Sequence, residues 1–144
     1  SIVDVRVFNY FSHTQDMNAR FLITDIVRAL KNNEVFKTSS DNIVRDFVTP
    51  PGFYALIQAI IDFKPINTAL DCYTKSPVSK FDLLSELESK FGLNYEINES
   101  IDIINATGSK INYYSTNKIA KDMGYDPINT SLESVIQEIN FLGL

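Results

Sequence analysis

The chain begins with the segment Ile2-Val3-Asp4-Val5-Arg6-Val7-Phe8-Asn9, which predicts a β-strand at the start of the domain. After its first two residues the segment alternates apolar and charged side chains, and most of its apolar residues are β-branched. Both features are typical of strands. Asn9 is expected at the carboxyl end of this strand. Further β-type runs follow at residues 35–37, 43–48 and 68–73.

Helical spacing of apolar residues alternates with these runs. It predicts a helix over residues 17–30, with Asp16 as a possible N-cap and Asn32 and Asn33 at its end. Residues 53–63, directly after Pro50-Pro51-Gly52, predict a helix that is apolar on most sides and therefore buried.

Capping signals predict the remaining helices. Ser79 and Asp82 are spaced to begin a helix that runs to Phe91, with Gly92 as its C-cap. Thr130 and Glu133 resemble a capping box for a last helix over 132–142, and residues 118–123 predict a short helix before Gly124. The chain is therefore expected to form a single domain, residues 1–144, of mixed α/β or α+β class.

Composition excludes several classes of function. The chain has 144 residues, 13 Lys+Arg against 18 Asp+Glu, and no basic cluster, so nucleic-acid binding is not expected. With Cys72 and His13 as its single cysteine and histidine, it offers neither an internal disulfide nor a Cys/His zinc site. Its longest apolar run, 53–61, is shorter than a membrane span. We expect a cytoplasmic domain that binds neither metal nor membrane.

Few residues suggest catalytic chemistry. His13 lies in a polar stretch and is interpreted as a solvated loop histidine. Tyr114 and Lys118 have Tyr-x-x-x-Lys spacing, but Tyr114 is expected at the end of a strand, so the motif is interpreted as a decoy. The five glycines are isolated, which excludes a Gly-rich phosphate loop. Arg45 in Arg45-Asp46-Phe47 suggests a fixed guanidinium suited to phosphate, with a structural Arg–carboxylate pair as the alternative.

Several motifs together suggest a family. Arg6-Val7-Phe8-Asn9-Tyr10-Phe11 is similar to the R-x-F-N-x-[FY]-G-P stretch of the extended short-chain dehydrogenases/reductases, the NAD(P)-dependent nucleotide-sugar epimerases and dehydratases. Arg20-Phe21 and the helix after it resemble the next family segment, and Arg45-Asp46-Phe47-Val48 matches R-D-[FY]-V. The resemblance continues through Leu70-Asp71-Cys72-Tyr73 with Ser79, and through residues 118–127 with Ser131-Leu132-Glu133, which resemble the terminal K-x-x-x-x-L-G-[WY]-x-P…S-L-E signature.

The resemblance covers only the C-terminal, substrate-binding part of that Rossmann-type family. It implies that the dinucleotide-binding half, with its NAD or NADP site and its catalytic Tyr-x-x-x-Lys, would lie upstream of Ser1. This chain alone is then expected to bind no cofactor and to supply no catalytic residue. The resemblance further implies that Asn9 donates to the diphosphate of a UDP-, GDP- or dTDP-sugar and that Arg45 pairs with its phosphates. Arg20 and Phe21 are weaker candidates for phosphate or base contact.

Departures from the family pattern keep a second hypothesis open. Ser12-His13 stands where the family has Gly-Pro, Pro50-Pro51-Gly52 where it has V-D-D, and Asp71 and Tyr73 where it has Asn and Gly. The alternative is a non-catalytic, stand-alone module that binds a nucleotide sugar or serves as a scaffold, for example in surface-polysaccharide assembly. In either case the first strand, residues 2–8, is expected to expose an unpaired apolar edge. Such an edge predicts self-association, for example as a homo-dimer.

Overall fold

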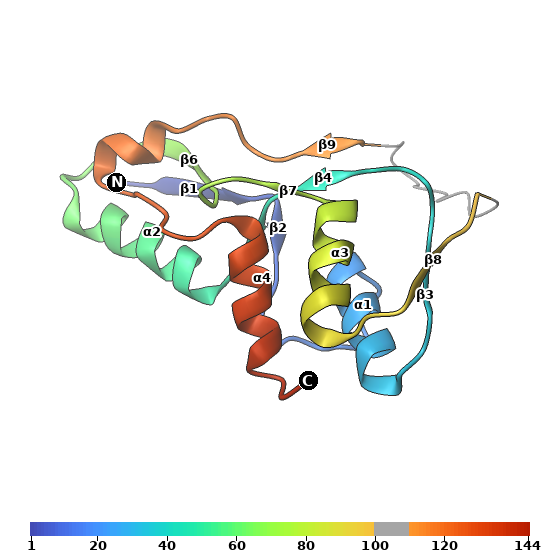
Figure 1. Cartoon of the computed structure of the whole chain (residues 1–144). Helices are drawn as coiled ribbons and strands as arrows, with labels where there is room; N and C mark the ends of the chain where they lie inside the picture. The colour runs from blue at the N-terminus through green and yellow to red at the C-terminus, as the bar shows by residue number, and fades with distance from the viewer. Residues whose placement is uncertain (100–109) are drawn as a thin grey trace.

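The computed structural model describes residues 1–99 and 110–144, which form a mixed α/β fold of short strands and helices (Figure 1). This agrees with the predicted fold class. The helices in the described residues are α1 (Leu22–Asn32), α2 (Pro50–Asp62), α3 (Lys80–Phe91), the 3₁₀ helix η1 (Ile119–Met123) and α4 (Ser131–Asn140). The strands there are β1 (Val3–Val7), β2 (Asn9–Tyr10), β3 (Phe36–Thr38), β4 (Val44–Arg45), β5 (Phe47–Val48), β6 (Thr68–Cys72), β7 (Val78–Ser79), β8 (Tyr95–Ile97) and β9 (Asn112–Tyr113).

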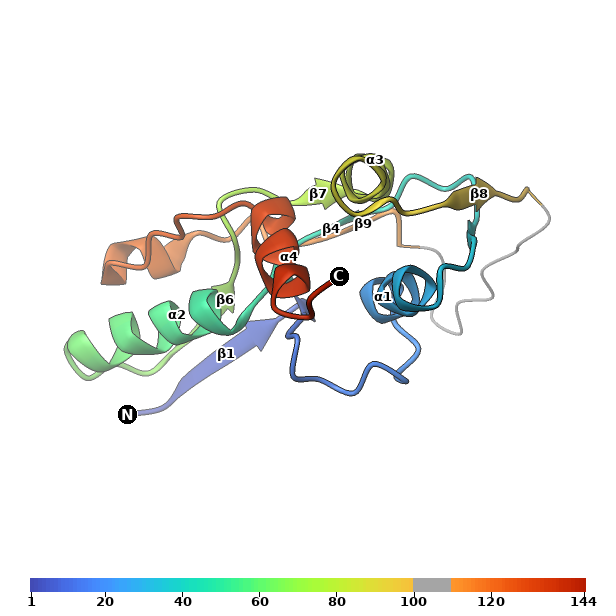
Figure 2. The ribbon, with the colours of Figure 1, turned by 60° about the horizontal axis from the view of Figure 1, so that its bottom comes forward.

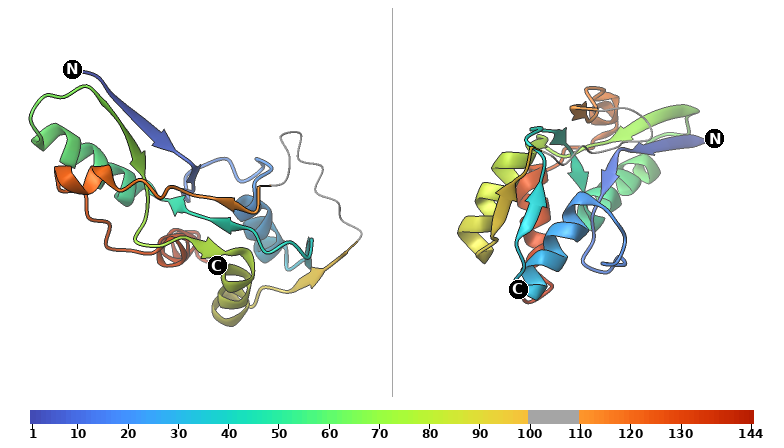
Figure 3. Two further views of the ribbon diagram at one scale, coloured as in Figure 1. Left: turned by 90° about the horizontal axis from the view of Figure 1, so that it is seen from above. Right: turned by 90° about the vertical axis from the view of Figure 1, so that its right-hand side faces the viewer.

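Parallel pairing dominates the strands. β1 lies beside β6, with Val3 opposite Thr68 and Val7 opposite Cys72. β2 pairs in parallel with β5, and β3 with β8. β4 is the middle strand of the order β7-β4-β9, antiparallel to β7 and parallel to β9. Figures 2 and 3 show β4 and β9 side by side. In the described part of the chain, the second edge of β1 is unpaired.

The first strand ends earlier than predicted. β1 stops at Val7, and after Phe8 the chain pairs with a different strand, so Asn9 lies in β2 rather than at the end of β1. A matching interruption at Asp46 divides the expected strand 43–48 into β4 and β5. Because β5 is the partner of β2, each interruption lets its segment contribute one strand to one sheet and the next strand to another.

Helix α1 begins later than predicted. Its N-cap is Phe21, not Asp16, because the Asp16 carboxylate accepts the backbone N–H of Asn18 and holds a turn there. Thr24 Oγ1 accepts the backbone N–H of Phe21 at 3.1 Å, which satisfies one free amide of the first turn. Asn33, at a φ of 53°, ends the helix as predicted.

Helix α2 differs from its prediction in position and in burial. It begins at Pro50 rather than after Gly52, because a helix's first turn needs no N–H from its own residues and tolerates proline. Leu56 is its one buried residue, whereas Tyr54 and Ile61 are each 68% exposed. The expectation of a buried helix is therefore wrong, because α2 packs mainly on β6 and η1 and leaves its outer face uncovered among the described residues.

Two apolar cores hold the elements together. One lies between α1, α3 and α4, around Ile26, Leu84 and Ile139. The other lies between α2, β6 and η1, around Leu56 and Leu70. Figure 1 shows α4 standing between the two groups of elements. The predicted caps are confirmed: Ser79 for α3, the capping box of Thr130 and Glu133 for α4, and left-handed Gly92 and Gly124 as C-caps.

No helix in residues 1–99 or 110–144 is long and apolar enough to span a membrane.

Candidate functional site

A cavity of about 760 Å³ lies between the start of α1 and the strands β2, β3 and β4. Its volume is within the range of small-molecule sites, roughly 300–1,000 Å³. All four residues that the sequence analysis selected, Asn9, Arg20, Phe21 and Arg45, lie on its wall. That they bind a substrate remains a prediction. The other lining residues are Phe8, Tyr10, Phe11, Gln15, Leu22, Ile23, Asp25, Phe36, Lys37, Thr38, Ser39, Asp41, Ile43, Phe47, Lys80 and Lys110.

Arg45 is held rigidly by backbone carbonyls. Its Nη1 donates to the carbonyl oxygens of Val44 at 2.8 Å and Ile111 at 3.0 Å, and its Nη2 donates to that of Lys110 at 2.8 Å. No carboxylate of the described residues forms the ion pair with it that the alternative of a structural Arg–carboxylate pair requires. These bonds use three of the five guanidinium N–H groups. Two, including that on Nε, have no partner within the described ranges.

Tyr113 is an aromatic support for this cation. The Arg45 guanidinium lies 6.0 Å from the centre of its ring, and the Lys110 ammonium lies 4.7 Å from it. Phe8 meets the same ring edge-on at 5.2 Å. Partial burial lowers the pKa of Arg45, although the group stays charged at neutral pH. Lys110 thus adds a second positive charge beside Arg45, and no motif in the sequence indicates it.

Asn9 spans the interruption between strands. Its Nδ2 donates to the carbonyl oxygens of Asp46 and Tyr113, each at 3.4 Å. These distances are long for N–H···O bonds, which center near 2.9–3.0 Å. The amide is therefore placed at the end of the cavity near Arg45 and weakly bound, so that a ligand oxygen can compete for its N–H groups.

Arg20 and Phe21 form an exposed rim at the start of α1. The Arg20 side chain is 85% exposed and its Nε lies 3.5 Å from Asp25 Oδ1, an oxygen that Arg28 also contacts. Phe21 is 66% exposed although it is a large apolar side chain. Both residues are therefore free to move toward a bound molecule, which Arg45 is not.

Lys80 is a further cation of the cavity that the sequence analysis missed. It follows the Ser79 cap at the start of α3 and is only 2% exposed. Its ammonium donates to the Ser39 carbonyl at 2.6 Å, and burial lowers its pKa. With Arg20, Lys37, Arg45 and Lys110 it makes five cations on the cavity wall against two carboxylates, Asp25 and Asp41. This surplus, in a chain of net charge −5, favours an anionic ligand.

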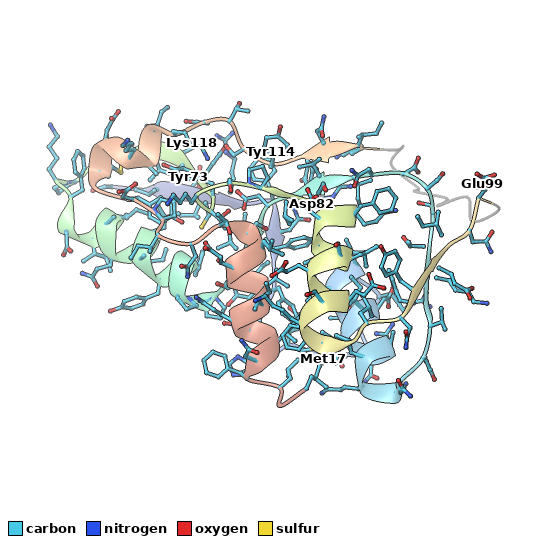
Figure 4. All side chains as sticks on the ribbon, viewed as in Figure 1. Met17, Tyr73, Asp82, Glu99, Tyr114 and Lys118 are labelled. Atoms are coloured by element: carbon cyan, nitrogen blue, oxygen red, sulfur yellow. The ribbon has the colours of Figure 1, made fainter. Side chains whose placement is uncertain are left out.

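The other residues considered for chemistry have structural roles. His13 is not a solvated loop histidine, because its Nδ1 lies 2.7 Å from Glu138 Oε2 and its ring packs on Phe141. Tyr114 directly follows the end of β9, as the sequence predicts. Residues 114–118 are not helical, so Tyr114 and Lys118 do not share a helix face as a catalytic Tyr-x-x-x-Lys motif requires. Figure 4 shows Lys118 beside Tyr73, and its Nζ lies 3.5 Å from the centre of that ring.

A dinucleotide would find no phosphate cradle among the described residues. The parallel strand β5 leads directly into α2, but that helix opens with Pro50 and Pro51, which have no N–H to donate to a phosphate. Gly92 and Gly124 are helix C-caps rather than parts of a phosphate loop. The residues that the structure describes thus offer no phosphate loop of this kind for NAD or NADP. They also contain no group of three or more His, Cys, Asp or Glu placed to hold a metal ion.

The fold matches one part of the chain of several larger enzymes. The solved structures with this fold include UDP-sugar 4-epimerases and a dTDP-glucose 4,6-dehydratase, which confirms the family resemblance at the level of the fold. No family model and no curated protein matches the sequence.

Three solved structures illustrate this similarity. UDP-glucuronic acid 4-epimerase from Bacillus cereus, in complex with UDP-glucuronic acid and NAD, superposes with a TM-score of 0.78 at 16% identity, over 98% of this chain and 45% of its own. UDP-glucose 4-epimerase from Thermotoga maritima, with UDP-glucose, gives 0.75 at 15% identity over 98% and 45%. dTDP-glucose 4,6-dehydratase from Bacillus anthracis, with NAD, gives 0.72 at 11% identity over 98% and 44%. The chain spans less than half the length of these enzymes.

Proposed function

We propose that the cavity binds a nucleoside diphosphate sugar, and that the chain acts as the substrate-binding part of an NAD(P)-dependent nucleotide-sugar epimerase or dehydratase of the cytoplasm. The observation that carries this proposal is the rigid Arg45 guanidinium beside Lys110, in a cavity with a surplus of positive charge. The solved structures with this fold include enzymes that hold UDP-glucose or UDP-glucuronic acid, which supports the choice of ligand class.

The diphosphate is assigned to Arg45 and Lys110. Because three carbonyls fix the guanidinium, little conformational entropy is lost when its remaining N–H groups bind a phosphate oxygen. The Lys110 ammonium adds a second positive charge beside the Tyr113 ring. The Asn9 amide, weakly bound at the same end, supplies a neutral donor for an adjacent oxygen.

In the full reaction, a nicotinamide cofactor would take up and return the hydride of the sugar ring. In this proposal, NAD or NADP is bound by residues other than those of this cavity. The described residues hold the nucleotide of the substrate and set the direction in which the attached sugar points out of the cavity. Their contribution is to orient the substrate rather than to break bonds.

The test is nucleotide-sugar binding measured by isothermal titration calorimetry with UDP-glucose. We expect Arg45→Ala to weaken binding at least tenfold, since charge-assisted hydrogen bonds are worth about 1.5–3 kcal/mol. Lys64→Ala is the matched control, because it also removes one positive charge but lies outside the cavity, and it should change affinity less than twofold. Circular dichroism would verify that both variants fold. Equal affinity of the two variants would remove Arg45 from the site.

A non-catalytic nucleotide-sugar-binding or scaffold role is the second candidate. It is favoured by the two prolines at the start of α2, which leave that helix without a phosphate cradle. Both candidates share the binding step, so the discriminating experiment is turnover. Conversion of UDP-glucose by the native protein in the presence of NAD supports the enzyme, and binding without conversion supports the module.

A further inference from the structure

The sheet β7-β4-β9 brings Lys80 and Lys110 to one of its ends, next to the strand that carries Arg45. β4 is parallel to β9 and antiparallel to β7, so the start of β9 and the end of β7 lie at the same end of the sheet as the start of β4. Lys110 comes just before β9, and Lys80 directly follows β7. The backbone N–H of Lys80 donates to the Ile43 carbonyl at 2.8 Å, which fixes it beside the residues that precede Arg45.

Lys80 differs from the other two cations in its burial and in its partners. Its ammonium donates to the Ser39 carbonyl at 2.6 Å and lies 3.4 Å from Ser39 Oγ. The ring centre of Phe81 lies 5.0 Å from the same Nζ. No carboxylate in the described ranges forms an ion pair with it. One of its three N–H groups therefore has no hydrogen-bond partner among the described residues.

A buried ammonium with no carboxylate of the described residues within ion-pair distance is costly, although the charge of Asp41 partly offsets this cost, and its position in the cavity wall offers a reason for it. Burial lowers the pKa of Lys80, which is the expected result of this desolvation. Ser39 comes directly after β3, the strand that begins with Phe36. The ammonium is thus tied to the β3 side of the cavity, while Arg45 and Lys110 are tied to Tyr113 on the β9 side.

The β3 side suits the base of a nucleotide. Phe36, the first residue of β3, lines the cavity there with flat apolar surface, on which a base can stack. If the diphosphate lies on the β9 side, as proposed above, a base that extends toward β3 approaches the side of the cavity to which Lys80 is tied.

We propose that Lys80 is a specificity residue that donates to a carbonyl oxygen of a pyrimidine base, so that the site selects uridine over cytidine nucleotides. This inference rests on the proposed function, because it assigns the base of the same ligand. An ammonium group has donors only. It can bind the 4-carbonyl of uracil, whereas it meets the 4-amino group of cytosine donor against donor, with one buried N–H on each side left unpaired.

The experiment compares the affinities of UDP and CDP, which carry the same diphosphate, by isothermal titration calorimetry with the native protein. Wild-type protein should bind UDP at least tenfold more tightly than CDP. Lys80→Gln should bind the two within threefold, because its amide can present either its N–H or its carbonyl to the base. Lys80→Met fills the same buried space and should weaken UDP binding at least tenfold while changing CDP binding less than threefold. Circular dichroism would confirm the folding of both variants.

The outcomes separate this inference from the proposed function. Equal binding of UDP and CDP by the wild type, an unchanged ratio in Lys80→Gln, or an equal loss of both ligands in Lys80→Met would each overturn the assignment of Lys80 to the base. All three results leave the nucleotide site itself standing. If the wild type binds neither nucleotide, the proposed function fails along with the inference.

Discussion

Asp46 is expected to be one of the residues on which the stability of the fold depends most. The residue is 3% exposed, and its carboxylate accepts the backbone N–H of Thr74 at 3.0 Å and the Thr74 hydroxyl at 2.5 Å. It thereby fastens the interruption between β4 and β5 to the loop that follows β6. The bonds join segments 28 residues apart in the chain.

The Asp46→Ala variant should lower the free energy of unfolding by about 3 kcal/mol. The Thr74 hydroxyl keeps a second acceptor, the Ser76 carbonyl at 2.9 Å, but the buried Thr74 amide has none left. A hydrogen bond to a charged group contributes about 1.5–3 kcal/mol, and an unpaired buried amide costs about 1–3 kcal/mol. With an unfolding entropy of about 2.1 cal/mol/K per residue, this loss corresponds to a drop in Tm of about 10 °C.

Urea unfolding followed by circular dichroism is the suitable assay, because the chain has no tryptophan. Asp46→Asn keeps one acceptor oxygen and should cost about half as much as the alanine variant. Asp62→Ala is the matched control, since Asp62 is exposed and its hydrogen bonds with Gln58 lie at the surface, and it should cost less than about 0.5 kcal/mol. Equal stabilities of the Asp46→Ala and Asp62→Ala variants would refute the reasoning.

Two further predictions concern titration and association. Burial raises the pKa of the Cys72 thiol to about 11, so the folded state keeps this proton longer than the unfolded state does, and stability is lost as pH rises from about 9 to about 11. The pH dependence of urea unfolding should show a loss of about 2 kcal/mol that Cys72→Ala lacks; parallel curves for the two proteins would contradict it. Self-association through the open edge of β1 should appear in sedimentation velocity and weaken in Ile2→Lys, whereas monomeric wild-type protein at high concentration would argue against it.

Local patterns in the sequence were sufficient for most elements but not for their ends. The β-branched alternation before Asn9 and the capping pairs at Ser79 and Thr130 are short-range signals, and the structure confirms them. Helix α1 was expected to begin at Asp16, because the sequence does not show that this carboxylate serves a turn of its own. The exposure of α2 depends on what packs against it, which apolar periodicity alone cannot reveal.

The candidate site shows the same division. Its four predicted residues came from motifs, and the fold brings them to one cavity. Lys80 and Lys110 carry no motif and were missed. They stand beside Arg45 because β7 and β9, which are far from β4 in the chain, pair with it on either side.

The sequence by itself determined the class of the fold, the nature of its strands and helices, and Asn9 and Arg45 as candidates for phosphate binding. The fold class and the elements depend on interactions between residues a few positions apart, which periodicity and capping express directly. Asn9 became a candidate through the family resemblance alone, and Arg45 through that resemblance and the chemistry of its guanidinium. Only the tertiary structure decided that His13 pairs with Glu138, that carbonyls hold Arg45, and that Lys80 is buried with its ammonium on the Ser39 carbonyl. These contacts join residues between 41 and 125 positions apart. They arise from strand pairing and helix packing, whose partners no local pattern specifies.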